Sequence, residues 1–418
     1  MEASPSEFRD WAHLPPLVSS LISVKIKSIP DYFRFRAVCS PWRSASDPKP
    51  RHLPPQVPWL MIPYDPYKKN DDGIRLFYDC SESKTHKLHL PETINMICCG
   101  SFGGWLLLVM AAGEDMFLLN PLTRARIQLP STATLEEHVR NDYSDIYFHE
   151  EGQQGYNPYL GNFAIRRVTF STDLSDPNCL ITIFLKGFQA ILCCRVGDSG
   201  WTKVNTGWGD VDALYYNGRF HVLFQGTMDI FEPHEPEEKI QLYGMKKELL
   251  LCKSKYFLQG KSGVYIVAIQ SIEDEEEETC LKYQDNLAVH KRKKVTKKTH
   301  KKIIELYQFQ EQQEVKFKKV TDTNNDNIFY GYDNEYKCHY LVVSDEGESL
   351  AEDCIHMEYK CSFFAKKNRS GSYCRIDSTK LDKQKVEFPA PPVVLNLGNV
   401  PLSWLRARPA MWFQPSFD

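Results

Sequence analysis

The sequence has no long apolar run, no apolar leader and no strong excess of either charge. Its longest apolar run, residues 105–112, is far too short to cross a bilayer. The first residues, MEASPSEFRDW, are polar and acidic, whereas a secretory leader requires an apolar stretch. The formal net charge of −3 is too small to indicate nucleic acid as the main partner. We therefore expect a cytoplasmic or nuclear protein with no membrane and no nucleic-acid partner.

The spacings that bind metals are also missing. The chain has 13 cysteines, but none forms a C-x-x-C pair, and Cys98-Cys99 and Cys193-Cys194 are adjacent doublets. Neighbouring residues of a strand point to opposite faces, so a doublet is a poor clamp for one metal ion. We interpret the cysteines as reduced, small buried hydrophobes and predict no metal site.

Two segments come near a nucleotide-binding or a calcium-binding loop, but each lacks a required residue. Gly260-Lys261-Ser262 is preceded by Lys255 where a P-loop needs glycine. Asp322-x-Asn324-x-Asp326 has the spacing of an EF-hand, but Asn327 replaces its glycine and Asp333 its glutamate. No spacing singles out a catalytic pair of carboxylates. The sequence therefore predicts no catalytic residue and no cofactor.

Residues 11–46 are typical of a small helical module. Pro15 fits a first helical turn, Ser28 with Asp31 is typical of a capping box, and Ser40-Pro41 predicts a third helix. The apolar residues that recur with the period of a helix are Leu14, Leu17, Val18, Leu21, Ile22, Ile26 and Ile29. Three short helices cannot bury all of these side chains alone, so a second domain or a partner must cover some of them. We expect core packing at Ile26, Ile29 and Phe33, and partner contact at Leu14, Pro15, Leu17, Val38 and Trp42.

Two signatures in this module resemble the F-box. Leu14-Pro15 matches its opening, and Phe35-Arg36-Ala37-Val38-Cys39 with Trp42-Arg43 matches its closing signature. Pro16-Leu17 departs from the acidic residue that many members carry at this point. The resemblance implies binding to a Skp-family adaptor and, through it, to a cullin. The adaptor-binding residues that it implies are Leu14, Pro15, Leu17, Val18, Leu21, Val38, Cys39, Trp42 and Arg43.

The remainder of the chain is typical of short antiparallel strands. Asn217-Gly218 between two apolar runs is a strong hairpin signal. The runs that predict strands are 84–90, 105–109, 116–119, 181–185, 190–196, 201–204, 214–216, 219–224, 256–258, 264–269, 328–332 and 339–343. So many strands exceed one sandwich, and at about 40–50 residues per four-stranded blade they fit a β-propeller of six to eight blades.

Several landmarks of this region resemble the large domain of a plant F-box family. They are Gly104-Trp105-Leu106, Leu119-Asn120-Pro121-Leu122-Thr123, Asn217-Gly218-Arg219-Phe220 and the run 409–415. That domain is regarded as a β-propeller related to kinase-interacting F-box proteins (KIB type). The fold class that we expect is a small α-helical F-box followed by a large antiparallel β-propeller.

We expect the following division of the chain. Residues 1–10 form a flexible N-terminus, 11–47 the helical module, 48–70 a proline-rich connector and 71–418 the propeller. The proline-rich break predicts that module and propeller fold separately.

Residues 273–302 interrupt the strand pattern with opposite charge blocks. Residues 273–278 are all acidic, and basic residues follow from position 291 onward. Blocks of like charge disfavour packing, so we expect a solvated loop. The alternative is a nuclear-import signal made of Lys291, Arg292, Lys293, Lys294, Lys297 and Lys298.

The function that we expect is substrate recognition for a Skp–cullin–F-box ubiquitin ligase. The helices would bind the adaptor and the propeller a target protein, while the chain itself would not be an enzyme. Two alternatives are a non-degradative interaction scaffold and, less favoured, a propeller-fold enzyme. A buried carboxylate cluster in the propeller's central channel would favour the enzyme.

Overall fold

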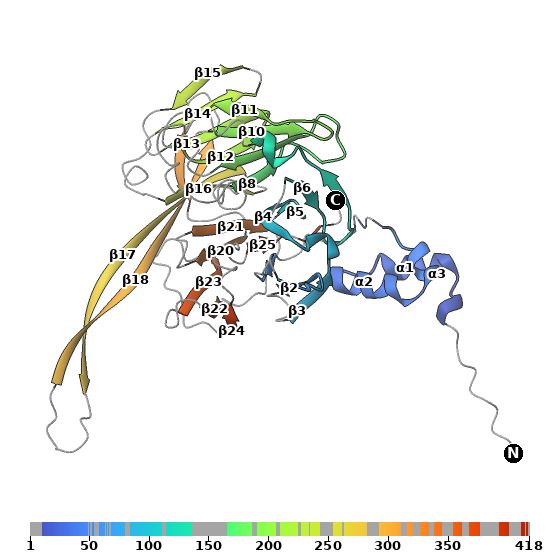
Figure 1. Ribbon diagram of the computed structural model, residues 1–418, viewed down its shortest axis with the longest axis horizontal. Helices are drawn as coiled ribbons and strands as arrows, with labels where there is room; N and C mark the ends of the chain where they lie inside the picture. Colours follow the sequence, from blue (N-terminus) through green and yellow to red (C-terminus); the bar gives the residue numbers. More distant parts are fainter. Residues whose placement is uncertain are drawn as a thin grey trace.

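The chain folds into a helical arm attached to a ring of β-sheets (Figure 1). The computed structural model describes residues 11–48, 50, 52–53, 58–62, 64, 66, 68–79, 84–110, 114–135, 165–185, 190–205, 210–224, 227–233, 235–242, 254–260, 263–281, 292–310, 316–320, 327–333, 338–344, 354–361, 368–376, 393–400, 411–413 and 415–416. Several sequence-based expectations lie outside the described residues: the flexible segment 1–10, Lys261 and Ser262, positions 322–326, and Lys291.

Four short helical elements open the fold. They are the 3₁₀ helix η1 (Trp11–His13) and the α-helices α1 (Pro16–Ser23), α2 (Ile29–Val38) and α3 (Ser40–Ser44). Pro15 is the N-cap residue of α1, one position before the first turn in which the sequence predicted it. Pro16 occupies that turn instead, as expected of a residue with a fixed φ and no N–H. Ser28 is the N-cap residue of α2, but its hydroxyl makes no capping hydrogen bond. The predicted capping box is therefore wrong in its chemistry, although the helix starts where expected.

Six sheets follow among the described residues. The first contains β25 (Met411–Phe413), β1 (Trp59–Met61), β2 (Ile74–Asp79) and β3 (Lys84–His89), and the 3₁₀ helix η2 (Pro91–Thr93) leads out of it. The second contains β4 (Met96–Phe102), β5 (Trp105–Met110), β6 (Met116–Leu119) and β7 (Arg126–Gln128). The third contains β8 (Ile165–Phe170), β9 (Leu180–Leu185), β10 (Ala190–Arg195) and β11 (Thr202–Asn205).

The other three sheets complete the ring. The fourth contains β12 (Asp210–Tyr216), β13 (Arg219–Phe224), β14 (Met228–Glu232) and β15 (Glu235–Leu242). The fifth contains β16 (Ser254–Gly260), β17 (Gly263–Leu281), β18 (Arg292–Gln310) and β19 (Lys316–Val320). The sixth has the order β21 (Cys338–Ser344), β20 (Asn327–Asp333), β23 (Asn368–Ile376), β22 (Cys354–Cys361) and β24 (Val393–Val400).

One strand from each sheet faces the centre, and these strands contact one another in a closed circuit. The circuit runs β25, β4, β8, β12, β16, β21 and back to β25. Four of the sheets are antiparallel meanders that start at this inner strand and run outward in chain order. This is a β-propeller with six blades in the described part of the chain, within the predicted range.

The core lies between neighbouring blades. Leu106 and Leu108 of β5 pack in a cluster between the first and second sheets, whereas Trp105, Leu107 and Val109 pack between the second and third. Strand side chains alternate between faces, and here both faces are covered, so β5 is a continuous apolar run.

The cysteine doublets follow the same rule. Cys98 and Cys99 belong to different clusters, and so do Cys193 and Cys194. The prediction that each doublet divides between two faces is confirmed. Burial raises the pKa of the Cys193 thiol to about 12, which keeps it protonated and unreactive.

Two expectations about boundaries are wrong. Trp59–Met61 falls inside the predicted connector, yet it forms β1, because its three residues are buried between β2 and β25. The charged segment is not a loop where it is described: β17 and β18 pair from Tyr265↔Gln308 out to Leu281↔Arg292. In Figure 1 this hairpin projects far from the propeller.

Candidate protein-interaction site

Helix α1 turns its polar side inward and its apolar side outward. Its buried residues are the polar Ser19 and Ser23, which are 1% and 2% exposed. Leu17 and Leu21 on the other side are 71% and 56% exposed. A helix in a soluble domain normally turns its apolar face to the core. An apolar face turned outward on a folded helix indicates a surface that another molecule covers.

Ser23 can be buried in this orientation because its hydroxyl and its carbonyl both have hydrogen-bond partners. The Ser23 hydroxyl donates to the carbonyl of Ser20 at 2.7 Å. The carbonyl of Ser23 lies 3.0 Å from Nε2 of His52, in the segment that returns toward the propeller. Small hydroxyl side chains also let neighbouring chain segments approach closely, so α1 is held by its polar side.

The sequence-predicted contact residues divide between surface and interior. Pro15, Leu17, Val18, Leu21, Val38 and Arg43 are exposed, whereas Leu14, Cys39 and Trp42 are half-buried. Sequence reasoning left three exposed apolar residues out of the contact set: Trp11, Ile22 and Val24. Ile22 carried a usable signal, because it continues the helical repeat to which Leu17, Val18 and Leu21 belong.

Trp42 connects the helical elements of the module, although its side chain is only half-buried. Its ring packs on Phe35 at 4.6 Å between centroids, and its Nε1 donates to the carbonyl of Trp11 at 3.0 Å. Arg36 donates from Nη1 to the carbonyl of Ser46 at 2.8 Å. These contacts join η1, α2 and α3, so Trp42 combines a structural role with its half-exposed position.

Helix α2 anchors the module to the propeller. Ile29 and Tyr32 are buried in what we name the junction cluster, the apolar core between the first two sheets. The members of the junction cluster are Ile29, Tyr32, Trp59, Met61, Phe77, Leu90, Met96, Cys98, Leu106, Leu108, Phe117, Leu119, Leu122, Met411 and Phe413. Ile26 and Phe33 pack against it, so the prediction of core packing for these residues and Ile29 is confirmed.

The hydroxyl of Tyr32 closes the attachment. It donates to the carbonyl of Asp47 at 2.8 Å, and burial raises the pKa of the phenol. Tyr32 therefore stays neutral and ties α2 to the start of the connecting segment. The helical module and the propeller share one core, which the proline-rich break did not predict.

A partly buried ion pair joins inner strands at the propeller's centre. Arg167 of β8 donates from Nη2 to Asp212 Oδ2 of β12 at 2.7 Å and to the carbonyl of Phe257 on β16 at 2.8 Å. The backbone N–H of Phe257 donates back to Asp212 Oδ2 at 2.7 Å. Three inner strands are thus joined by one ion pair and two hydrogen bonds to the backbone of Phe257. Sequence patterns could not reveal this contact because the partners are far apart in the chain.

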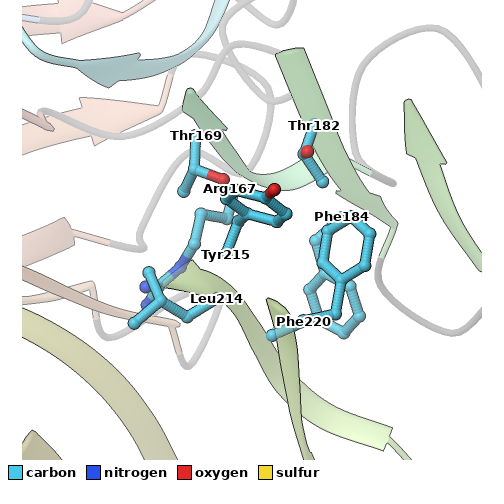
Figure 2. A pocket seen from close by; sticks show the side chains of 8 residues that line it. Arg167, Thr169, Thr182, Phe184, Leu214, Tyr215 and Phe220 are labelled. Atoms are coloured by element: carbon cyan, nitrogen blue, oxygen red, sulfur yellow. The ribbon is translucent and has the colours of Figure 1, made fainter. Parts of the chain in front are cut away.

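Arg167 also borders a crevice between the third and fourth sheets (Figure 2). Thr169, Thr182, Phe184, Leu214, Tyr215 and Phe220 line it with Ala213. Its empty volume is about 190 Å³ with the solvent at its mouth, below the 300–1,000 Å³ typical of ligand pockets. Asp212 is already paired, so this region offers a structural tie rather than a free acid or base.

The described residues add two further observations. They contain no group of three or more His, Cys, Asp or Glu side chains placed to hold a metal ion. None of their helices combines the length and apolar character that a bilayer span requires.

Comparison with known proteins gives these features a family context. The model of the KIB1-4 beta-propeller family matches residues 77–375, more than half of the chain. The chain is 28% identical over 233 residues to the F-box protein SKIP23 of Arabidopsis thaliana, covering 51% of this chain and 53% of that protein. It is 34% identical over 278 residues to the Arabidopsis F-box protein At4g00893, covering 62% of each. The chain spans about half the length of the first curated relatives that it matches.

Proposed function

The chain belongs to the KIB1-4 β-propeller family, and we propose that it is the substrate-recognition subunit of a Skp–cullin–F-box ubiquitin ligase. The observation that carries the proposal is the outward apolar face of α1, at the place where the sequence resembles an F-box. The names of its Arabidopsis relatives, which are F-box proteins, support the same assignment.

The adaptor-binding surface that we propose combines α1 with the end of α2 and with α3. Its residues are Leu14, Pro15, Leu17, Val18, Leu21, Val38, Cys39, Trp42 and Arg43, with Ile22 added from the structure. An apolar helix face of this kind docks in the apolar groove of a partner. Val38 is 57% exposed at the end of α2, so the surface extends beyond α1.

The proposed mechanism is proximity. The helices bind a Skp-family adaptor and through it a cullin, while the propeller binds a target protein. The ligase then holds the target near the ubiquitin carrier and raises its effective concentration. Because Ile29 and Tyr32 of α2 are buried in the junction cluster, α2 connects the proposed adaptor surface to the propeller. The chain itself carries out no bond chemistry in this proposal.

The test uses Leu17→Ala and Leu21→Ala in the full chain. Both side chains are mostly exposed, so truncation removes partner contact with little loss of internal packing. Each variant should weaken binding to a purified Skp-family adaptor by about 1–4 kcal/mol, measured by calorimetry, with an unchanged melting temperature. Trp42→Ala is a poorer probe, because its packing on Phe35 also stabilises the module.

Val196→Ala is the matched control, since Val196 is an exposed apolar residue of the propeller. It should leave adaptor affinity unchanged. Wild-type affinity in both α1 variants would refute the adaptor surface, and absence of binding by the wild-type chain would favour the non-degradative scaffold.

The proposal also retains the nuclear-import signal. Its described residues, Arg292, Lys293, Lys294, Lys297 and Lys298, lie on β18, and Lys291 precedes them in the sequence. Glu276↔Lys297 and Glu275↔Lys298 are register pairs of the hairpin. A receptor for the basic segment must therefore bind it on a strand whose neighbour is acidic.

A further inference from the structure

The C-terminal segment closes the propeller. Strand β25 pairs with β1 through Trp59↔Phe413, Leu60↔Trp412 and Met61↔Met411. It also contacts β4 on one side and β21 on the other, so it joins the first blade to the last. The strand that follows the helices in the chain is thus paired with a strand from the opposite end of the sequence.

Asn120 holds the chain just beyond β25. Its side chain is fully buried, and its Oδ1 accepts the backbone N–H groups of Leu122 at 2.9 Å and Thr123 at 3.1 Å. Its Nδ2 donates to the carbonyl of Ser416 at 3.0 Å. One amide therefore shapes the Asn-Pro-Leu-Thr turn and holds the C-terminal segment (residues 411–413 and 415–416).

Gly104 leaves room for Ser416, the residue whose carbonyl Asn120 binds. Its φ is +82°, a conformation that side chains disfavour, and a Cβ built there would lie 2.5 Å from Cβ of Ser416. The same Cβ would lie 3.2 Å from the backbone N and Cα of Ser416. Two sequence landmarks of the propeller, around Gly104 and Asn120, thus converge on Ser416.

The C-terminal segment that Asn120 and Gly104 position contributes to the core against which α2 packs. Met411 and Phe413 are buried in the junction cluster, which also contains Ile29 and Tyr32 of α2. The ring of Phe413 lies 5.4 Å from that of Phe77 in an edge-on arrangement, and Met411 Sδ lies 3.6 Å from Cys98 Sγ. Loss of β25 would remove two large side chains from the core on which α2 rests.

We propose that the C-terminal segment is a positioning element for the adaptor-binding helices. Fixed by Asn120 and Gly104, it completes the junction cluster and thereby holds α2 in place. Loosening it should loosen the helical module selectively, before the distant blades respond. The adaptor part of this inference rests on the proposed function, whereas the coupling between the C-terminal segment and α2 does not.

The test is Gly104→Ala in the full chain, followed by hydrogen exchange and mass spectrometry. Amides of α2 and β1 should exchange on the order of ten-fold faster, while β9 and β10 of the third blade keep wild-type protection. Gly218→Ala is the matched control, because Gly218 has a similar φ of +79° but no atom within 4 Å of an added Cβ. It should leave α2 unchanged.

Two further variants keep the test decisive. Asn120→Asp retains an acceptor for the turn but removes the N–H donor to Ser416, and should reproduce the exchange pattern of Gly104→Ala. Adding Ser416→Gly to Gly104→Ala removes the closest clash and should restore part of the protection of α2.

Two results of the exchange experiment would overturn the coupling between the C-terminal segment and α2. Unchanged α2 exchange, with faster exchange at 411–416, would overturn the coupling. Equal acceleration in every blade would show a general loss of stability and also overturn it. Adaptor affinity, measured in parallel, should fall with α2 protection; if wild type binds no adaptor, the proposed function fails while the exchange result still decides the coupling.

Discussion

Single residues decide which side of α1 meets the solvent. Ser19 and Ser23 supply the inward side with small hydroxyl groups, and Leu17 and Leu21 are left outside. A Leu at position 19 or 23 would compete for the interior and rotate the helix, because burying a leucine stabilises a fold by about 1.5–3 kcal/mol. The polar residues of this helix are therefore as important for the proposed surface as the apolar ones.

His221 provides a prediction at the same scale. It has no exposed surface on β13, and burial lowers the pKa of its imidazole to about 4. In the unfolded chain a histidine titrates near 6.5, so between these values the unfolded state binds more protons. Stability should therefore fall as the pH decreases from about 6.5 to 4, by about 3 kcal/mol in total.

The measurement is urea unfolding of wild type and His221→Gln at several pH values across this window. The variant should show a flatter dependence of the unfolding free energy on pH. His89→Gln, at an exposed position, is the matched control for the loss of one histidine. Parallel curves for wild type and His221→Gln would contradict the burial argument.

At the scale of elements, the β17–β18 hairpin shows why the charge blocks led to a wrong expectation of a loop. Each block repels itself, which argues against packing within one segment. The antiparallel register instead places Glu275 opposite Lys298 and Glu276 opposite Lys297. Opposite charges across two strands contribute about 0.2–1 kcal/mol per pair, so the blocks are compatible with a hairpin.

The outer hairpin should be dispensable for the propeller. Strand β16 pairs only with residues 263–269 of β17, and β19 only with residues 306–310 of β18. Replacing residues 273–300 by a short Gly-Ser turn should leave the melting temperature almost unchanged. If the import proposal holds, a fluorescent fusion of this variant should move from nucleus to cytoplasm.

A charge variant separates the effect of the basic side chains from the effect of shortening the hairpin. Changing Lys297 and Lys298 to Gln keeps the hairpin length and should weaken nuclear accumulation in the same direction. An unchanged distribution in both variants would refute the import signal, and a large drop in melting temperature would show that the outer hairpin supports the fifth blade.

At the scale of the whole molecule, α2 of the helical module shares the junction cluster with the first two sheets of the propeller. Removing residues 1–47 takes Ile29 and Tyr32 out of the junction cluster and exposes their partners. Losing a large buried side chain costs about 2–5 kcal/mol, so the remaining chain should unfold at lower urea concentration than the full chain.

Urea unfolding of residues 48–418 beside the full chain checks this. The full chain with Leu17→Ala serves as the control, because it lacks part of the surface but keeps the core. Equal urea midpoints for the truncated and full chains would restore the original expectation of separately folding parts.

The sequence by itself determined the helical module, the positions of about half of the strands and the propeller class. Those features depend on local patterns: the helical repeat before Ile29, the apolar run of β5 and the Asn217-Gly218 turn, both of whose residues have positive φ. Each of these is visible within a few neighbouring residues, which is why it could be predicted without coordinates.

Only the tertiary structure decided which residues meet across the chain. Nothing local to Asp212 indicates Arg167, and nothing local to Ser416 indicates Gly104 or Asn120. The same holds for α2, whose seat is completed by Phe413 from the far end of the sequence. Closing a ring brings distant segments together, and the burial that fixes them depends on shape in three dimensions rather than on spacing along the chain.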